Sequence, residues 1–159
     1  MHVVKIAPMT SADIDEVSAL LRHCFNWLAD REGFTPAARA FLTGERSSAE
    51  TVREESKTRP HLVAKDDCGT LLGLAAIRGN ELARLYVDPR FHGQRVGCKL
   101  FEAAEIMIRD AGFTEMTVAA LTESAATFYR ARGMHEVGRQ IYEPEIFMGR
   151  EVVLLAKAL

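Results

Sequence analysis

The 159-residue sequence has no uninterrupted apolar run of about 18 residues, so it predicts no membrane-spanning helix. Its first ten residues lack a basic segment followed by a long apolar one, so no signal peptide is expected. A basic stripe is also missing, since 20 Lys and Arg are interleaved with 22 Asp and Glu for a net charge of -2. These absences favour a cytoplasmic protein whose partners are neither nucleic acid nor membrane.

Cysteine and histidine are few and do not cluster. Cys24, Cys68 and Cys98 form no CxxC pair and are odd in number, which favours reduced thiols. The five histidines form no HxxxH or HxH pair, so no metal site is expected. Two nucleotide-binding motifs are also missing, because GxGxxG does not occur and no Gly-Lys-Ser/Thr ending of a Walker loop is found.

The composition is that of one globular domain over residues 1–159, with 48% hydrophobic and 26% charged residues. Residues 2–6 predict a strand, and residues 10–30 predict a helix that begins with a capping-box pair, Thr10 and Asp13. In this helix Ile14, Val17 and Leu21 start an apolar stripe at helical spacing. Residues 31–60 are polar and helix-prone and predict two short helices, which form either a mobile cover over a site or a plain surface pair.

The rest of the chain alternates short apolar runs with turns and helical stretches. Strands are predicted at 61–65, 70–77 and 81–87, followed by a helix at 97–111, a strand at 114–121, a helix at 123–133 and strands at 134–140 and 151–159. We write the order as β-α-α-β-β-β-α-β-α-β-β. The predicted fold class is therefore α/β (α+β), a mixed, mostly antiparallel sheet with helices on both faces.

One helix has an unusual beginning, the sequence HGQRVG at residues 92–97. The first amides of a helix lack partners in the chain and lie at its positive dipole end, so a phosphate can bind there. Gly93 and Gly97 leave the backbone uncovered, while His92 and Arg95 add donors and positive charge. The loop predicts a diphosphate site, although glycines near a helix start also occur as ordinary turn residues.

The run from 81 to 134, with LARLYVDPRFHGQRVG and then ATFYRARGM, resembles the GNAT superfamily of acyl-CoA-dependent N-acyltransferases, whose element order is also similar. The family signature is Gln/Arg-x-x-Gly-x-Gly/Ala. Gly97 matches it strictly, His92 stands at the Gln/Arg position and Arg95 replaces the first glycine. An arginine at that position must either swing aside or bind phosphate itself.

The resemblance implies acetyl-CoA, or another acyl-CoA, as cosubstrate and no metal. The strand before the loop would bind the pantetheine arm through its backbone, and an amide near Val87 would polarise the acyl carbonyl. Thr122 stands where the family often has Asn. The implied cofactor-binding residues are Leu85, Tyr86, Val87, His92, Gly93, Gln94, Arg95, Val96, Gly97, Cys98, Thr122, Ala125 and Phe128.

Two residues are implied as catalytic. Tyr129 aligns with the family tyrosine that protonates the leaving thiolate, a role that suits a phenol with an ordinary pKa of about 10. Glu81 is the candidate base for the acceptor amine, because on an extended strand it shares a face with Leu85 and Val87. The alternatives are a Tyr129 that only packs on the sheet, a solvated Glu81 in a turn, and water as the base. Cys98 could form an acyl-cysteine, but a small core thiol is favoured.

The sequence therefore predicts an N-acyltransferase that moves an acetyl group to a primary amine by direct attack in a ternary complex. The acceptor is a small-molecule amine or a peptide, and a homodimer is a possible assembly. The alternatives are a non-catalytic acyl-CoA-binding regulatory module on the same fold and a structural domain without a ligand.

Overall fold

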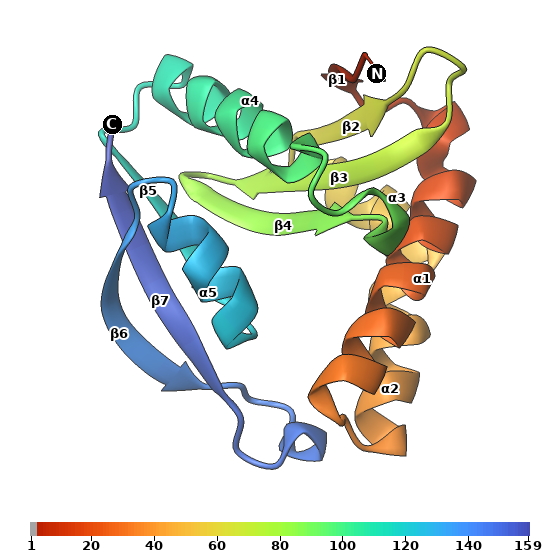
Figure 1. Cartoon of the computed structure of the whole chain (residues 1–159), viewed down its shortest axis with the longest axis vertical. Helices are drawn as coiled ribbons and strands as arrows, with labels where there is room; N and C mark the ends of the chain where they lie inside the picture. The colour runs from red at the N-terminus through yellow and green to blue at the C-terminus, as the bar shows by residue number, and fades with distance from the viewer. Residues whose placement is uncertain (1–2) are drawn as a thin grey trace.

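The computed structural model describes residues 3–159 and contains one seven-stranded sheet in the order β1-β2-β3-β4-β5-β7-β6. All neighbouring strands are antiparallel except the pair β4 and β5, which is parallel (Figure 1). The strands are β1 (Lys5–Pro8), β2 (His61–Lys65), β3 (Leu71–Arg78), β4 (Glu81–Val87), β5 (Glu115–Ala120), β6 (His135–Ile141) and β7 (Glu151–Ala158).

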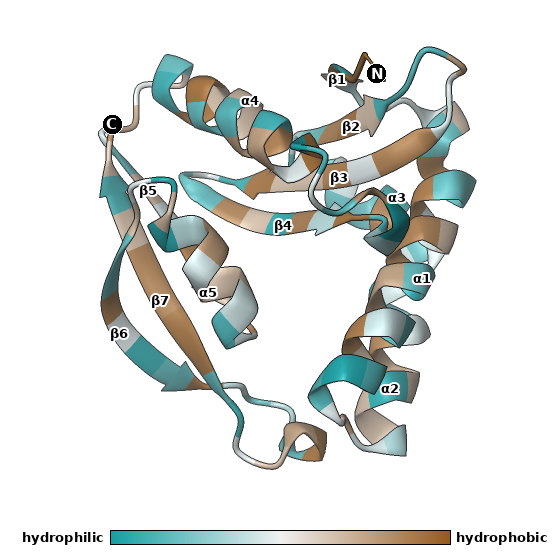
Figure 2. Cartoon of the chain, viewed as in Figure 1, coloured by the Kyte–Doolittle hydropathy of each residue, from teal (hydrophilic) through white to brown (hydrophobic). Residues whose placement is uncertain are grey.

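Five α-helices cover the two faces of the sheet: α1 (Ile14–Glu32), α2 (Pro36–Thr43), α3 (Ala49–Ser56), α4 (Val96–Asp110) and α5 (Glu123–Arg130). One core contains α4 and α5 packed on the sheet through Leu100, Ala104 and Tyr129. The second core lies on the other face, where α1 to α3 pack on β2 and β3. Figure 2 shows β7, which lies between β5 and β6, as mostly hydrophobic and the edge strand β6 as mostly hydrophilic.

The predicted mixed, mostly antiparallel α/β fold is confirmed, with local differences. Strands β2 and β4 have the predicted bounds, but β1 is shifted to Lys5–Pro8, and His2 lies outside the described residues. The two short helices after α1 are both present. Three α-helices therefore precede β2, one more than the predicted order of elements contains. At the start of α1 the Thr10 amide donates to Asp13 Oδ2 at 2.8 Å, as the predicted capping box requires.

Strands β4 and β5 separate along most of their length, which positions the site. Their only backbone pair among the described residues joins Glu81 and Thr117. On its other edge β4 pairs with β3, but Ala83 has no partner there because Ala76 faces Arg84 and Ile77 faces Leu82. This bulge bends β4, and its edge towards β5 is left unpaired beyond Glu81.

Candidate acyl-CoA and acceptor site

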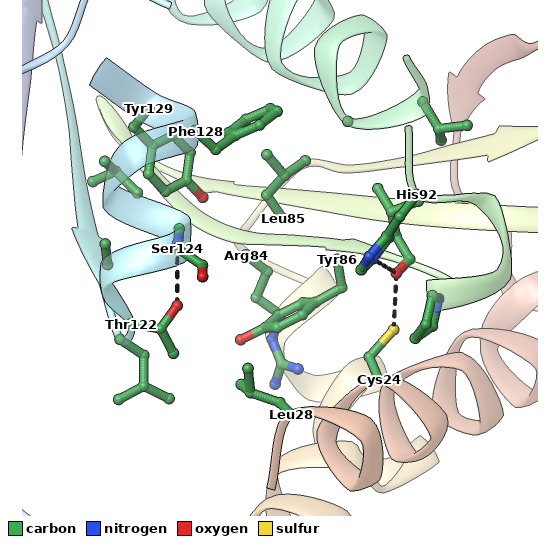
Figure 3. A pocket seen from close by; sticks show the side chains of 18 of the residues that line it. Cys24, Leu28, Arg84, Leu85, Tyr86, His92, Thr122, Ser124, Phe128 and Tyr129 are labelled. Atoms are coloured by element: carbon green, nitrogen blue, oxygen red, sulfur yellow. Dashed lines mark hydrogen bonds between the residues drawn. The ribbon is translucent and has the colours of Figure 1, made fainter. Parts of the chain in front are cut away.

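A cavity of about 600 Å³ opens where β4 and β5 separate. Its walls come from α1, β4, the start of α4, β5 and α5, and Figure 3 shows some of the side chains that line it. It brings together the predicted residues Leu85, Tyr86, Val87, His92, Gly93, Arg95, Val96, Gly97, Cys98, Thr122, Ala125, Phe128 and Tyr129. Two predicted residues, Gln94 and Glu81, do not line it; Gln94 is exposed to solvent.

The residues of the first turn of α4 line this cavity, and their amides have no helical partner. The first backbone bond of the helix runs from Lys99 N to Arg95 O at 3.1 Å, so the amides of residues 96–98 lie ahead of it. No side chain caps this helix start, whereas hydroxyls of Thr35, Ser48 and Thr122 cap α2, α3 and α5. Uncapped amides at a positive helix end can bind an anion, such as a diphosphate.

The residues of the 92–97 loop have distinct backbone roles. Arg95 is left-handed, with φ 66°, a conformation that glycine adopts without strain. This explains why a glycine suits this position in the signature. At Gly97 a Cβ atom would lie 3.3 Å from the Phe128 ring, so glycine lets α5 approach the start of α4.

His92 contacts the strand beside the cavity. Its Nε2 donates to Val87 O at 3.0 Å, and its ring packs edge-on against Trp27 with centroids 5.0 Å apart. The Cys24 thiol also donates to Val87 O, at 3.5 Å. Burial, and then the nearby Asp88 carboxylate, raise the pKa of Cys24 to about 12, so this thiol stays protonated. One nitrogen of His92 is thus bonded to the backbone of β4. The predicted role of His92 as a phosphate donor did not include this contact.

Tyr129 lies on α5 with its ring in the core and its hydroxyl towards the cavity (Figure 3). The ring packs against Phe128, with centroids 5.4 Å apart. The side-chain hydrogen bonds of residues 3–159 do not include this hydroxyl, which lines the cavity although Tyr129 as a whole is only 7% exposed. Burial raises its pKa above the ordinary value, and Tyr86 adds to the effect. The phenol is therefore protonated at neutral pH and able to donate.

Glu81 lies away from these groups, and the predicted face-sharing is wrong. The bulge at Ala83 breaks the alternation of β4, so Leu82, rather than Glu81, packs in the same core as Leu85 and Val87. The Glu81 carboxylate instead forms an ion pair with Arg78 at 2.6 Å, at the β3–β4 turn. Glu32, at the end of α1, is the acidic side chain that lines the cavity, and it pairs with Arg150 at 3.3 Å.

Sequence reasoning missed much of the α1 wall and three arginines. Cys24, Leu28 and Arg31 recur at helical spacing on the cavity side of α1, a pattern that also fits a core stripe. Of the aromatic residues in this region, Trp27 lines the cavity, while Phe25 and Phe34 pack in or against the core.

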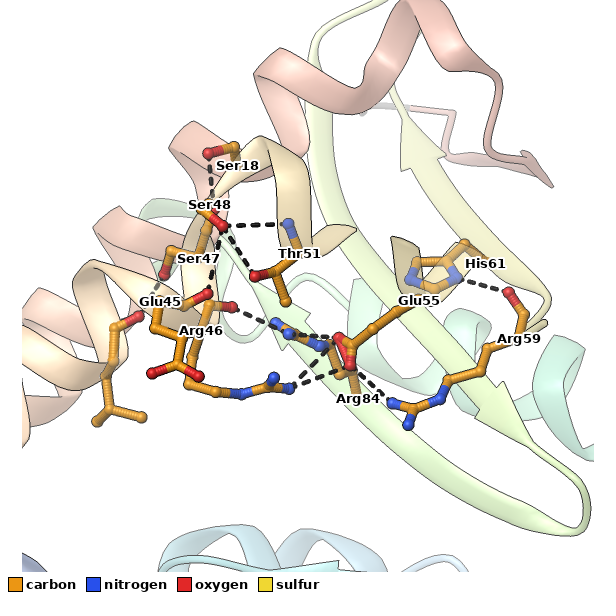
Figure 4. Close-up of polar contacts among 11 residues, drawn as sticks. Ser18, Glu45, Arg46, Ser47, Ser48, Thr51, Glu55, Arg59, His61 and Arg84 are labelled. Atoms are coloured by element: carbon orange, nitrogen blue, oxygen red, sulfur yellow. Dashed lines mark hydrogen bonds and ion pairs between the residues drawn. The ribbon is translucent and has the colours of Figure 1, made fainter. Parts of the chain in front are cut away.

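Arg132 lies over the Phe128 ring at 4.1 Å and donates to the Cys98 sulfur. Arg84 is buried on β4 and binds Glu55, which also pairs with Arg46 and Arg59 (Figure 4). Burial acts to raise the pKa of Glu55, but Arg84, Arg46 and Arg59 together hold it below its ordinary value. Glu55 is therefore ionised, and no sequence motif pointed to this cluster.

Two features are absent from residues 3–159. No group of three or more His, Cys, Asp or Glu side chains is arranged to hold a metal ion. No helix in this part of the chain combines the length and apolar character needed to cross a membrane.

Comparisons with known proteins agree with this geometry. Residues 30–148 match the family model described as acetyltransferase (GNAT) domain. A GCN5-related N-acetyltransferase from Rhodopseudomonas palustris superimposes with a TM-score of 0.86 at 21% identity, over 100% of this chain and 98% of that one. No curated protein sequence matches significantly.

Two further similar structures contain a cofactor. The PaiA N-acetyltransferase from Thermoplasma acidophilum, in complex with coenzyme A, has a TM-score of 0.79 at 20% identity and covers 99% of both chains. YncA from Salmonella typhimurium, a putative acetyltransferase with acetyl-CoA, has a TM-score of 0.72 at 17% identity, over 99% of this chain and 94% of that one. At these identities the likeness concerns the fold.

Proposed function

Because the chain belongs to the GNAT acetyltransferase family, we propose that it transfers an acetyl group from acetyl-CoA to a primary amine. The observation that carries this proposal is that one cavity joins the uncapped start of α4, the unpaired edge of β4 and the free hydroxyl of Tyr129. A structural domain without a ligand would have no need for this combination.

The residues present fit an acyl-CoA. The amides of residues 96–98, with Arg95 and Arg132 beside them, supply donors and positive charge for a diphosphate. The unpaired edge of β4 at Leu85 and Val87 supplies backbone groups for the pantetheine amides and the acyl carbonyl. When bound, acetyl-CoA supplies an activated acyl group as a thioester.

The transfer step balances without a metal or a covalent enzyme intermediate. The neutral amine nitrogen forms a bond to the acyl carbon, the carbon–sulfur bond breaks, and Tyr129 gives its proton to the departing sulfur. The acceptor nitrogen loses one proton to water or to a carboxylate. Tyr129 is then reprotonated from solvent, and the cavity returns to its first state.

Glu81 and Glu32 are competing candidates for the carboxylate that receives the acceptor proton. Glu81 is the prediction from the family spacing, but its ion pair with Arg78 and its place outside the cavity do not favour it. Glu32 lines the cavity, and we propose that the proton reaches it through water. The cytoplasmic location and the possible homodimer remain predictions.

Acetyl-CoA binding is the first test, read as a shift of the melting temperature. At a hundredfold excess over Kd, the ligand adds about 2.7 kcal/mol to the free energy of unfolding, roughly 5–10 °C for a chain of this size. Gly97→Leu should abolish the shift, because its side chain would meet Phe128 and enter the cavity. Lys99→Leu, on an exposed position of the same turn, is the matched control.

Turnover is the second test, read as release of free CoA thiol over a panel of amines and peptides. Thiol release that depends on the amine supports the acetyltransferase. Binding of acetyl-CoA without turnover on any acceptor would instead support the non-catalytic acyl-CoA-binding module. The absence of both binding and turnover would contradict the proposed function.

A further inference from the structure

We propose that the acceptor is an amino acid or a similar amino carboxylate, and that Arg84 binds its carboxylate. This inference rests on the proposed acetyltransferase function and adds the substrate class. Arg84 lies on β4 and lines the cavity, and its side chain is only 5% exposed. In Figure 3 it is seen beside Tyr86, whose phenol also faces the cavity.

The hydrogen bonds of Arg84 are incomplete. Its Nη2 donates to Glu55 Oε1 at 2.8 Å and to the carbonyl of Arg46 at 2.9 Å. Its Nη1 is buried and has no partner among residues 3–159. Buried guanidinium nitrogens in folded proteins normally have partners, because an unmet donor is costly. A carboxylate oxygen of the acceptor is the partner that matches this donor in charge and geometry.

The charges around Arg84 also favour an anion. Glu55 is the carboxylate within this cluster, and it already pairs with Arg84, Arg46 at 3.3 Å and Arg59 at 2.7 Å (Figure 4). His61 lies nearby, and its Nδ1 donates a hydrogen bond to Arg59 O. A histidine side chain is neutral or positive, so it adds no negative charge. Three guanidinium groups against one carboxylate leave an excess of positive charge on this side of β4.

No negative charge in the cavity competes with such an anion. Among the described residues that line it, the acidic side chain is Glu32, and Arg150 neutralises it at 3.3 Å. Arg95 and Arg132 lie at the other end, beside the start of α4, where we place the diphosphate. Arg84 is therefore a cationic position separate from the one that the cofactor would use.

The position of Arg84 on β4 explains why the anion belongs to the acceptor. Arg84 directly precedes Leu85, the first residue of the segment expected to hold the thioester. Successive strand residues point to opposite faces, so Arg84 and Tyr86 share the face that packs towards α1 and α3. Arg84 and the segment Leu85 to Val87 are neighbours on β4, so an acceptor whose carboxylate binds Arg84 would present its amine to the same strand.

The experiment compares matched acceptors on the unmodified protein. Each of the common amino acids is paired with its carboxamide, and CoA release is measured with saturating acetyl-CoA. We expect kcat/KM at least about tenfold higher for the carboxylate member, with the difference mainly in KM. Equal rates, or a preference for the carboxamide, would overturn the proposal while leaving the acetyltransferase standing. Absence of turnover on every acceptor would overturn both.

Substitutions then assign the preference to one side chain. Arg84→Lys keeps the charge but loses the planar fork, and Arg84→Gln loses both, so both should raise KM for the amino acid about tenfold or more and leave acetyl-CoA affinity unchanged. Arg59→Gln removes another partner of Glu55 outside the cavity and should retain the preference. A preference that survives in folded Arg84→Lys would contradict the assignment. If neither Arg84 variant folds, the matched-acceptor comparison on the unmodified protein decides alone.

Discussion

Tyr129, the proposed acid, lies in the wall of the cavity, and its hydroxyl has no hydrogen-bond partner among residues 3–159. Tyr129→Phe keeps the ring contacts with Phe128 and removes only the proton donor. We expect turnover to fall by about 10²–10⁴-fold with acetyl-CoA affinity unchanged, measured by thiol release and by calorimetry. Tyr142→Phe is the control, because Tyr142 packs on Phe147 outside the cavity.

The raised pKa of Tyr129 adds a pH dependence to the same prediction. The phenol stays protonated below its pKa, so turnover should show no alkaline decline from this group between about pH 7 and 9. Full turnover in Tyr129→Phe with a chemistry-limited acceptor would reduce the residue to packing.

The two candidate carboxylates are separated by paired substitutions. Glu32→Gln should lower turnover at neutral pH by about 10²-fold, with a smaller loss at high pH where free amine is abundant. Glu81→Gln should change neither the rate nor the pH profile, because it removes only a pair with Arg78. The reverse outcome would restore the base role predicted from the family spacing, and no effect of either would favour water alone.

At the scale of elements, the start of α4 combines strain with a binding site. A left-handed residue other than glycine costs about 1–2 kcal/mol, part of which glycine loses again in chain entropy. We expect Arg95→Gly to raise the melting temperature by about 2–4 °C and, because it loses a guanidinium beside the cavity, to weaken acetyl-CoA binding.

Met148→Gly is the matched control for that element. Met148 is also left-handed, with φ 56°, but it is 81% exposed and outside the cavity. The Met148→Gly variant should gain stability without a change in acetyl-CoA affinity. Melting curves and titration calorimetry measure the two quantities. If Arg95→Gly binds acetyl-CoA as tightly as the unmodified protein, the Arg95 side chain swings aside and does not bind phosphate.

Across the whole molecule, carboxylates with a lowered pKa link stability to pH, and three of them have largely buried side chains. Lys65 lowers the pKa of Asp13 by a hydrogen bond at 2.6 Å. For Glu55 and Asp88, burial opposes the effect, but neighbouring arginines lower the pKa overall. A lowered pKa in the folded state means that the unfolded chain binds more protons on acidification. The stabilisation from these carboxylates is therefore fully present above their pKa in the unfolded chain, near 4. It is lost as the pH falls through their lower pKa values in the folded state.

This linkage can be measured by urea unfolding between pH 7 and pH 3. We expect a shallow decline of the free energy of unfolding as the pH falls through about 6.5, because burial lowers the pKa of His61, and a steeper decline below pH 4. Asp13→Asn should cost about 1–3 kcal/mol at pH 7 and make the decline shallower, because the bonds with Lys65 and Thr10 depend on the charge. An equally steep decline in this variant would contradict the assignment to Asp13.

How far the sequence predicted the molecule depended on how local each signal was. Strand β4 and the Thr10–Asp13 helix start follow from apolar runs and capping residues, which act over a few positions. The prediction that Glu81 shares a face with Leu85 and Val87 was wrong. The bulge at Ala83 arises from pairing with β3, and the alternation of residues along one strand cannot reveal it.

The candidate site divides in the same way. Gly97 and Tyr129 lie in short motifs, and the sequence placed them in one site with the neighbouring loop. Arg84 gave no signal, because its partner Glu55 is 29 positions away, on helix α3 rather than on β4. The contact of His92 with Val87 O also required the loop to fold back on its own strand. Residue roles and the single-domain organisation stay predictions.

The single pair between Glu81 and Thr117 has a mechanical consequence. Among the described residues, few backbone bonds join the two half-sheets at this point, so the hydrophobic core that both halves share holds them together. The proposed acid, Tyr129, is carried by α5 on one half, and the carbonyl-binding edge of β4 belongs to the other. A pantetheine chain bound between the halves would take the place of a missing strand and stiffen the joint. The substrate itself would then complete the alignment of the groups that act on it.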